Sequence, residues 1–342
     1  MIGLGIESSC DETSVGIVRN GKDLLSLKTY SQIPLHAIHN GIVPEIASRS
    51  HLEKINYLID EALSEAEISL NQIGYIAVTN RPGLLGSLLI GVQTAKALGI
   101  ALDIPVVPID HLEAHFSIVR LENHIFQYPY LGLLLSGGNS AIFKVNSPDE
   151  METICDTNDD AIGEAFDKIS VLLNLGYPGG PIIEKEAFKH KREKKEVPLF
   201  PKLLKDNHEE LRFSYSGIKT SVLQLTKKNT GYKSFIPKIC YDFQNSVFEL
   251  VERNLIKSIE KTKLKNVIAA GGVLANSNLR ERLKKLANKY NFEIVYPEKK
   301  VFCTDNGAMV ACQGFLIIES GKKYPDDFKI SPSRESYYEI KT

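Results

Sequence analysis

Two histidines stand four positions apart in the sequence HLEAH at residues 111–115, directly after the strand-like residues 104–110. On a helix, His111 and His115 would lie one turn above each other, so both imidazoles could reach one metal ion. In the zinc-protease pattern H-E-x-x-H, the glutamate directly follows the first histidine and serves as the general base. Glu113 stands two positions on, about 200° round the helix, and should point away from the ion. The spacing therefore indicates a metal clip without a protease base, and two polar residues on a half-exposed helix are the alternative.

Asp305 is a candidate third ligand. It follows the strand-like residues 293–296 and stands where a helix would begin. An aspartate there can cap the first helical turn or offer an oxygen to a metal. Together with His111 and His115 it would form a three-ligand set with open coordination positions, which is typical of catalytic rather than structural metal sites. A plain helix cap is the alternative.

Two short loops rich in serine, glycine and threonine, residues 8–13 and 136–140, interrupt strand-like segments. Such loops expose backbone N–H groups without side-chain obstruction, as a phosphate group requires, although each is also compatible with an ordinary turn. The flanking strand-like segments are residues 1–7 and 14–19 for the first loop, and residues 131–135 and 141–145 for the second. After residue 19, the pair Asn20-Gly21 favours a hairpin turn.

A second repetition supports a duplicated architecture, because a strand, a glycine-bearing loop and a helix follow one another in both halves. The two copies are residues 73–79, 80–83 and 88–98, and residues 266–270, 271–272 and 276–287. Long amphipathic helices are expected at residues 52–66 and 241–259. The pattern predicts two α/β domains with a cleft between them, and in open α/β sheets ligands bind at such glycine loops and helix N-termini.

The composition describes a folded protein of 342 residues, with 43% apolar residues and a net charge of −1. This length suggests two domains, and the balanced charge leaves any nucleic-acid contact to local patches. Five cysteines without a C-x-x-C pair fit a reducing compartment. We expect neither a secretion signal nor an import leader, and no uninterrupted apolar run of about 18 residues is present. These features predict a cytoplasmic protein that does not span a membrane.

The middle of the chain differs from the rest in its amino-acid composition. Residues 155–160 are acidic and polar, and a helix is expected to begin at residue 163 and to end at residues 175–181. The sequence PGGP at residues 178–181 is a rigid bend whose backbone could approach a ligand, or a plain connector. The basic segment, residues 185–205, is the best local patch for RNA phosphates, and a solvated surface is its alternative.

Taken together, eight motifs in order resemble the TsaD family of tRNA threonylcarbamoyladenosine transferases, and they span almost the whole chain. They are ESSCDET at 7–13, HNGIVPE with ASR at 39–49, NRPGL at 80–84, HLEAH at 111–115, LSGG at 135–138, GYPGGP at 176–181, GGVLAN at 271–276 and TDNG at 304–307. The length resembles the bacterial form of the family.

The resemblance implies a duplicated actin/Hsp70-like (ASKHA) α/β fold with a central nucleotide and metal cleft. Its domains would be residues 1–125 and 126–342, with a helical and basic insertion around 150–235. It implies one divalent metal ion, Fe²⁺ or alternatively Zn²⁺, on His111, His115 and Asp305. The implied substrate contacts are Ser9, Leu134, Leu135, Ser136, Gly137, Gly138, Asp167, Gly180, Glu184 and Asn276. At position 184 archaeal-type relatives carry an aspartate, one methylene shorter. Asp11 and Glu12 correspond to acidic residues important for activity.

The activity implied is transfer of the threonylcarbamoyl group from threonylcarbamoyl-AMP to N6 of adenine 37 in tRNAs that read codons beginning with A, with release of AMP. The bacterial family works with the small paralogue TsaB and the ATPase TsaE, so partners resembling both are expected. Two alternatives belong to other classes. One is a metalloprotease of the O-sialoglycoprotein endopeptidase type, against which the position of Glu113 counts. The other is a non-catalytic nucleotide-binding scaffold, which has no need of a metal triad.

Overall fold

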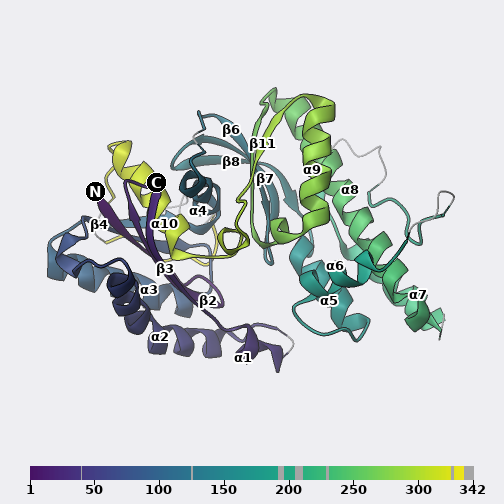
Figure 1. Cartoon of the computed structure of the whole chain (residues 1–342), viewed down its shortest axis with the longest axis horizontal. Helices are drawn as coiled ribbons and strands as arrows, with labels where there is room; N and C mark the ends of the chain where they lie inside the picture. Colours follow the sequence, from purple (N-terminus) through teal and green to yellow (C-terminus); the bar gives the residue numbers. More distant parts are fainter. Residues whose placement is uncertain are drawn as a thin grey trace, which may run out of the picture. The chain divides into compact units, whose positions relative to one another are not determined.

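The computed structural model describes residues 1–39, 41–124, 126–191, 196–204, 211–228, 231–324 and 327–334. The chain divides into two compact units (Figure 1). Unit 1 contains Met1–Ile125, Ser147–Glu150 and Pro297–Thr342, and unit 2 contains Phe126–Asn146 and Met151–Tyr296.

Unit 1 is built on one mixed sheet with strand order β3-β2-β1-β4-β5 among the described residues. Its strands are β1 (Ile2–Glu7), β2 (Glu12–Arg19), β3 (Asp23–Ser31), β4 (Tyr75–Arg81) and β5 (Val106–Asp110). Its helices are α1 (Ile33–Ala37), α2 (Pro44–Glu65), α3 (Leu85–Leu102), α4 (His111–Ser117) and α10 (Gly307–Glu319), with short 3-10 turns η1 (Leu70–Gln72), η2 (Ile118–Glu122) and η5 (Lys300–Phe302). The first three strands form an antiparallel meander, while β4 and β5 run parallel to β1.

The two faces of this sheet are covered by different helices. Leu4 and Ile6 share a buried apolar cluster with Ile55 of α2 and Val92 of α3. Because side chains alternate along a strand, Gly5 points to the opposite face. There the backbone of α10 comes so close that a Cβ on Gly5 would lie 2.0 Å from the Gly307 carbonyl oxygen. Glycine is therefore required for this contact, which seats the N-terminus of α10 directly on the sheet.

The predicted hairpin turn is confirmed. Asn20 and Gly21 both have positive φ, 53° and 62°, and they join β2 to β3. Two consecutive residues with positive φ match the right-handed twist of the flanking strands, which is why Asn-Gly is favoured at this point.

The C-terminal segment differs from the expected domain division. Residues 297–342 were expected in the second domain, but they belong to unit 1 because α10 packs on β1 and β2. Tyr75 of β4 anchors the helix by donating its hydroxyl to the Ala311 carbonyl oxygen at 2.8 Å. The prediction of an insertion around residues 150–235 stays a prediction.

Helix α3 is, in the part of the chain that the structure describes, the one helix long and apolar enough to cross a membrane by composition. It packs against β4 and α2, and its buried positions include Leu88, Val92 and Ala95. We therefore interpret α3 as a partly buried helix of unit 1.

Unit 2 contains a second mixed sheet, with order β11-β10-β6-β7-β8-β9 in the described ranges. Its strands are β6 (Tyr130–Leu135), β7 (Ser140–Ser147), β8 (Glu150–Thr157), β9 (Arg212–Phe213), β10 (Asn266–Ala270) and β11 (Glu293–Val295). Its helices are α5 (Ile162–Leu172), α6 (Gly179–Phe188), α7 (Ser216–Lys228), α8 (Ile236–Thr262) and α9 (Ser277–Tyr290), with η3 (Tyr232–Phe235) and η4 (Gly272–Ala275).

The two sheets repeat one topology. In unit 1, β1 pairs antiparallel with β2 and parallel with β4, and β4 pairs parallel with β5. In unit 2, β6 pairs antiparallel with β7 and parallel with β10, and β10 pairs parallel with β11. The predicted duplicated α/β fold is therefore confirmed at the level of strand order.

Two stretches of unit 2 differ from the sequence-based expectation. Part of the acidic stretch at residues 155–160 belongs to β8, a strand in which Met151 and Cys155 are buried and their neighbours are more exposed. The expected PGGP bend is the start of α6, which begins at Gly179. Pro181 is tolerated in the first helical turn because its missing N–H would have no acceptor within the helix.

Candidate functional site

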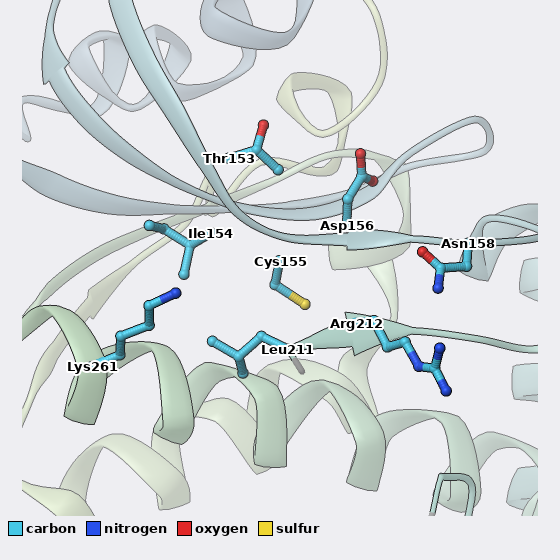
Figure 2. Close-up of a pocket in the computed structure, with 8 residues that line it drawn as sticks. All are labelled: Thr153, Ile154, Cys155, Asp156, Asn158, Leu211, Arg212 and Lys261. Carbon is cyan, nitrogen blue, oxygen red and sulfur yellow. The ribbon is translucent and has the colours of Figure 1, made fainter. Parts of the chain in front are cut away.

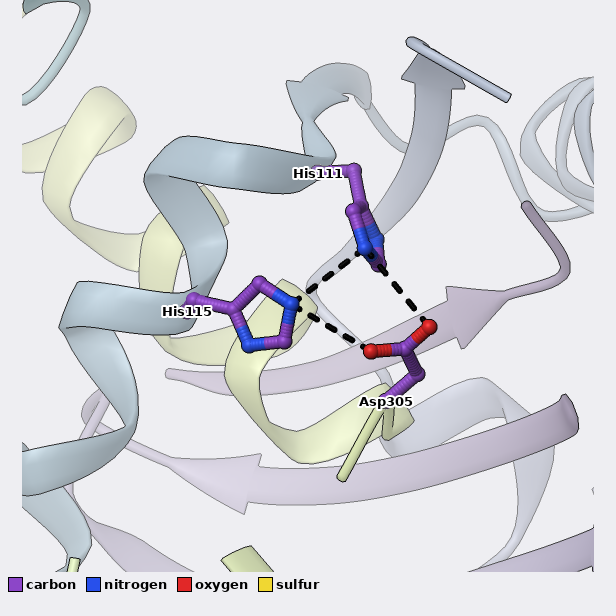
Figure 3. A group of neighbouring side chains, drawn as sticks. All are labelled: His111, His115 and Asp305. Carbon is purple, nitrogen blue, oxygen red and sulfur yellow. Dashed lines mark hydrogen bonds and ion pairs between the residues drawn. The ribbon is translucent and has the colours of Figure 1, made fainter. Parts of the chain in front are cut away.

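Three side chains of unit 1 converge on one point (Figure 3). Nε2 of His115 lies 3.2 Å from Oδ1 of Asp305, and Nε2 of His111 lies 3.6 Å from Oδ2. The two Nε2 atoms are 3.3 Å apart, and the candidate ligand atoms all lie within 4.8 Å of one another. Both histidines are buried and Asp305 is partly buried.

The local sequence explains this convergence. Both histidines lie on α4. Asp110 caps the N-terminus of this helix, because its Oδ1 accepts hydrogen bonds from the Leu112 and Glu113 N–H groups. The sequence also allows Asp305 to be the helix cap, but Asn306 caps α10, accepting from the Met309 N–H at 3.0 Å. The Asp305 carboxylate is therefore left to face the histidines.

Glu7, at the end of β1, is a site residue to which sequence reasoning gave no role. Its fully buried carboxylate accepts from the Ser9 N–H and from the Thr79 hydroxyl, each at 2.6 Å, and lies 3.0 Å from Nδ1 of His111. A carboxylate on Nδ1 leaves Nε2 of the same ring to face a metal, an arrangement typical of metal-binding histidines. The signal in the sequence was an acid ending an otherwise apolar strand.

The electrostatics of the set follow from its burial and its charges. Burial opposes the charge of His111, but the Asp305 and Glu7 carboxylates outweigh it and raise the pKa of His111 to about 9. Burial likewise opposes the charge of Asp305, yet His111 and His115 lower its pKa to about 2. The cluster thus holds negative charge that attracts a cation, and a metal ion would displace the proton from His111.

The donor set fits a divalent metal ion. Two imidazole nitrogens and one carboxylate bind metals at about 2.0–2.2 Å, which places neighbouring ligand atoms roughly 3–3.5 Å apart. Two of the observed separations, 3.2 and 3.3 Å, lie in that range, and the third, 3.6 Å between His111 and Asp305, lies just above it. Three protein ligands leave coordination positions for water or substrate.

The loop after β1 brings the other predicted residues of unit 1 to the metal cluster. Ser9 Oγ lies 3.3 Å from Nδ1 of His111. Glu12, half-buried, has its pKa raised well above the ordinary value by burial and by the nearby charges of Asp305 and Asp11. The loop thus presents two carboxyl groups, Asp11 and Glu12, of which Glu12 holds its proton more tightly than an ordinary carboxyl group does.

Glu113 points away from the metal ligands, as its spacing predicts. Its Oε1 accepts from Nη2 of Arg334 at 2.9 Å, and Nε of the same arginine donates to Asp110 at 3.0 Å. Burial and the Asp110 charge raise the pKa of Glu113 to about 8, although Arg334 opposes this. Glu113 is bound to a different partner, so the arrangement lacks the glutamate base of the zinc proteases.

In unit 2, the predicted loop residues 134–138 divide into two kinds. Leu134 and Leu135 are completely buried in β6, so they can offer only backbone groups. Ser136 donates its N–H to the Asn139 carbonyl, and its own carbonyl accepts from Gly163 of α5. Gly137 and Gly138 are exposed, and a Cβ on either would meet no atom within 4 Å. The loop therefore offers open backbone at its tip.

The remaining predicted residues of unit 2 lie at or bind to the first residues of helices α6 and α9. Oδ1 of Asp167 accepts from the N–H of Gly179, the first residue of α6, at 2.6 Å. Gly180, like the loop glycines, has open space around its Cβ position. Glu184 accepts from the Ser277 N–H at 2.8 Å and also from its hydroxyl, so this longer carboxylate already binds the start of α9.

Asn276 has two roles in the same region. Its side-chain oxygen caps α9 by accepting from the Leu279 N–H at 3.1 Å, and its amide nitrogen donates to Gln244 Oε1 at 2.9 Å. Both polar groups of the amide are hydrogen-bonded within the protein. Asn276 therefore has a structural role at the start of α9.

A separate cavity of about 520 Å³ lies in unit 2, beside β8, β9 and the end of α8 (Figure 2). Its lining includes Cys155, Asp156, Arg212 and Lys261. None of the predicted site residues lines it, so the cavity is not part of the candidate site.

Comparison with known proteins first defines the class of fold. HypF of T. kodakarensis superimposes with a TM-score of 0.63 at 16% sequence identity, covering 93% of this chain and 48% of that chain. Such a likeness shows the fold alone, and it confirms the actin/Hsp70-like (ASKHA) class.

Sequence comparison then defines the family. Residues 23–312 match the family described as TsaD: tRNA N6-adenosine threonylcarbamoyltransferase. A protein of that name from Leptospira interrogans serogroup Icterohaemorrhagiae serovar copenhageni is 52% identical over 339 residues, covering 99% of this chain and 100% of the relative. Another from Brachyspira hyodysenteriae is 46% identical over 310 residues, covering 90% and 89%. The chain belongs to the TsaD family.

Proposed function

We propose that this chain transfers the threonylcarbamoyl group from threonylcarbamoyl-AMP to N6 of adenine 37 in tRNAs that read codons beginning with A, releasing AMP. The single observation that carries the proposal is the convergence of His111, His115 and Asp305 in a chain of this family. A non-catalytic scaffold would not need these three ligands, and no observation favours the metalloprotease alternative.

The reaction forms a bond between N6 and the carbamoyl carbon and breaks the bond from that carbon to the phosphate oxygen. The exocyclic amine is a poor nucleophile, because its lone pair is delocalised into the purine ring. The protein must therefore align the reactants and take up the proton that N6 loses. We assign the proton to Glu12 or Asp11.

The metal site supports the same step. His111, His115 and Asp305 would hold one divalent ion, Fe²⁺ in our proposal with Zn²⁺ as the alternative, and such an ion supplies Lewis-acid polarisation of an oxygen. Glu7 keeps Nδ1 of His111 occupied, so that Nε2 faces the ion. The buried position of both histidines excludes water from one side of the ligand set.

For the donor, we assign the AMP portion to unit 2. The open backbone at Gly137 and Gly138 and the N-terminus of α6 at Gly180 offer N–H groups to the phosphate. Asp167 orders the start of α6 through Gly179. Ser136, Glu184 and Asn276 then act mainly by holding these segments in place, because each of them forms hydrogen bonds within the protein.

We further propose a small TsaB-like paralogue as a partner, docked on α2 and α3, and a TsaE-like ATPase as a second partner. Leu52 and Tyr57 of α2 are 63% and 70% exposed, and Leu85 and Leu89 of α3 are also exposed. The helices pack together, with Gly86 of α3 against Ser48 of α2, which lies one turn before Leu52. Leu52→Asp should weaken binding of the paralogue.

The tRNA surface is proposed on the basic segment, residues 185–205. Lys185, Lys189 and Lys191 are exposed. Arg192, Lys194, Lys195 and Lys205 lie outside the described residues. Changing Lys191, Arg192, Lys194 and Lys195 to Ala should flatten the salt dependence of tRNA binding, with a loss of about one unit of slope for each phosphate contact removed. A tRNA substrate and five free cysteines favour the cytoplasm as the compartment.

The test is reconstitution. The purified chain is supplied with threonylcarbamoyl-AMP, tRNA, the metal and both partners, and the tRNA is digested to nucleosides for mass analysis. We expect threonylcarbamoyladenosine among the nucleosides. When the partners are left out, the chain should turn over only slowly. A complete reaction that leaves the tRNA unmodified would overturn the proposed function.

A further inference from the structure

The imidazole of His51, in α2, is completely buried and both of its nitrogens have partners. Nε2 lies 3.0 Å from the carbonyl oxygen of Cys10, and Nδ1 lies 2.8 Å from the hydroxyl of Thr13. A carbonyl oxygen can only accept, so Nε2 carries the proton and Nδ1 accepts from Thr13. Burial lowers the pKa of His51, in keeping with a neutral ring.

The same loop is held a second time, one residue further along. The backbone N–H of Gln32 donates to the Asp11 carbonyl at 2.9 Å. The Gln32 side chain is itself fixed, because its Oε1 accepts from Nε2 of His36 at 3.2 Å. The carbonyl groups of Cys10 and Asp11, which precede Glu12, are therefore both bound by groups outside the loop.

Only one of these two contacts comes from a side chain. Gln32 uses its main chain, so the contact to Asp11 survives any substitution other than proline. His51 uses its ring. Nε2 of this ring links α2 to the acidic loop, residues 8–12, through the Cys10 carbonyl. Within the described part of the chain, the polar contacts of the ring are Cys10, Thr13 and Gln32, none of which is a metal ligand.

We infer that His51 is a positioning residue for the transfer reaction, whose Nε2–H sets the place of the acidic loop and thereby of Asp11 and Glu12. This inference rests on the proposed function, in which those carboxyl groups take the proton from N6. Displacement of a reacting group by about 1 Å can cost roughly 100-fold in rate. One hydrogen bond to the loop backbone can therefore govern the rate without touching substrate.

Two substitutions separate the two nitrogens. In His51→Gln the side-chain amide reaches the position of Nε2, so it can still donate to Cys10. In His51→Asn the shorter amide reaches only the position of Nδ1, so it keeps the contact to Thr13 and loses the donor to Cys10. Ile55→Ala is the matched control, because Ile55 is buried one turn further along α2 in the apolar cluster of the sheet.

The expected result is a split between rate and binding. With metal, adenylate and partners saturating, His51→Asn should lower the transfer rate about 10- to 100-fold. Its metal content and its KM for tRNA should stay at the wild-type values. The transfer rate of His51→Gln should stay within about threefold of the wild-type rate, because the hydrogen bond to the Cys10 carbonyl is retained. Ile55→Ala, assayed at a temperature that gives equal fractional stability, should transfer at the wild-type rate.

A second readout does not depend on activity. All five cysteines lie in the described part of the chain, and Cys10 is the one among them that is not buried. Its reaction rate with a chromogenic disulfide therefore reports the position of the loop. We expect faster labelling in His51→Asn and wild-type labelling in His51→Gln and Ile55→Ala.

Equal loss of activity in His51→Asn and His51→Gln, or unchanged labelling of Cys10 in His51→Asn, would overturn the inference. Failure of the proposed function looks different, because then the wild-type chain transfers nothing in the complete reaction. In that case the labelling comparison still decides whether His51 holds the loop.

Discussion

The candidate regions of the two units are built from different parts of the polypeptide. In unit 1 the groups are side chains that contact one another, such as His111 with Glu7 and His115 with Asp305. In unit 2 the open groups are backbone atoms of Gly137, Gly138 and Gly180, and the side chains around them bind the protein itself.

This difference follows from what each region would bind. A divalent metal ion needs imidazole nitrogens and carboxylate oxygens, which only side chains supply. A phosphate group is bound well by successive N–H groups, which any residue supplies but glycine leaves accessible. The two regions should therefore fail in opposite ways. Unit 1 should lose function when a side chain is removed, and unit 2 when a side chain is added.

The largest effect is expected for His115→Ala. The variant loses one of three metal ligands, so most of the bound metal should be lost and the transfer rate should fall at least about 100-fold. Metal content is measured by elemental analysis on the same sample that is assayed. The matched control is Phe116→Leu, a buried neighbour on α4 that has no ligand atom. A similar loss of metal in both variants would show that α4 packing, and not ligation, is responsible.

A smaller and opposite effect is expected for Gly138→Ala. Because a Cβ there meets no protein atom and φ is not positive, thermal stability should be unchanged. The added methyl group would obstruct the N–H donors, and losing one such hydrogen bond weakens AMP binding about 3- to 10-fold. Gly217→Ala is the control, since its Cβ position is equally open on α7. Calorimetric titration with AMP distinguishes them, and unchanged affinity in Gly138→Ala would remove this loop from the donor site.

The smallest effect is expected in the pH dependence of stability, through the buried imidazole of His51 in unit 1. The pKa of His51 is lowered by burial and by His36, against the opposing effect of Cys10, Glu7 and Asp11. Below a pH of about 6.5 the unfolded chain protonates this residue while the folded chain does not, so stability falls as the pH falls.

The measurement is the free energy of unfolding of wild type minus that of His51→Gln at several pH values. The difference should be constant above pH 7 and should fall below about pH 6.5, by no more than about 1.4 kcal/mol per pH unit. A difference that rises as the pH is lowered would mean that His51 is charged in the folded protein.

Local patterns in the sequence were sufficient for much of the fold and of the metal site. The Asn20-Gly21 turn and the strands on either side of residues 136–140 depend on neighbouring residues, and the structure has them. The spacing of His111 and His115 predicts a shared helix face, because helical geometry alone fixes it.

Contacts between distant segments were not predictable in the same way. The return of residues 297–342 to unit 1 depends on the fit of α10 against Gly5, which no local pattern encodes. The partner of Glu113 is Arg334, 221 positions away in the chain. Strand β8 was missed because it buries only two of its side chains, Met151 and Cys155, which leaves a weak alternating pattern.

The most direct test of the central claim is a metal titration of the metal-free wild-type chain, followed by the rate of threonylcarbamoyl transfer to tRNA. If His111, His115 and Asp305 hold one essential ion, the rate should rise in proportion to added metal and reach its maximum at one ion per chain. Full transfer by the metal-free chain would contradict the account.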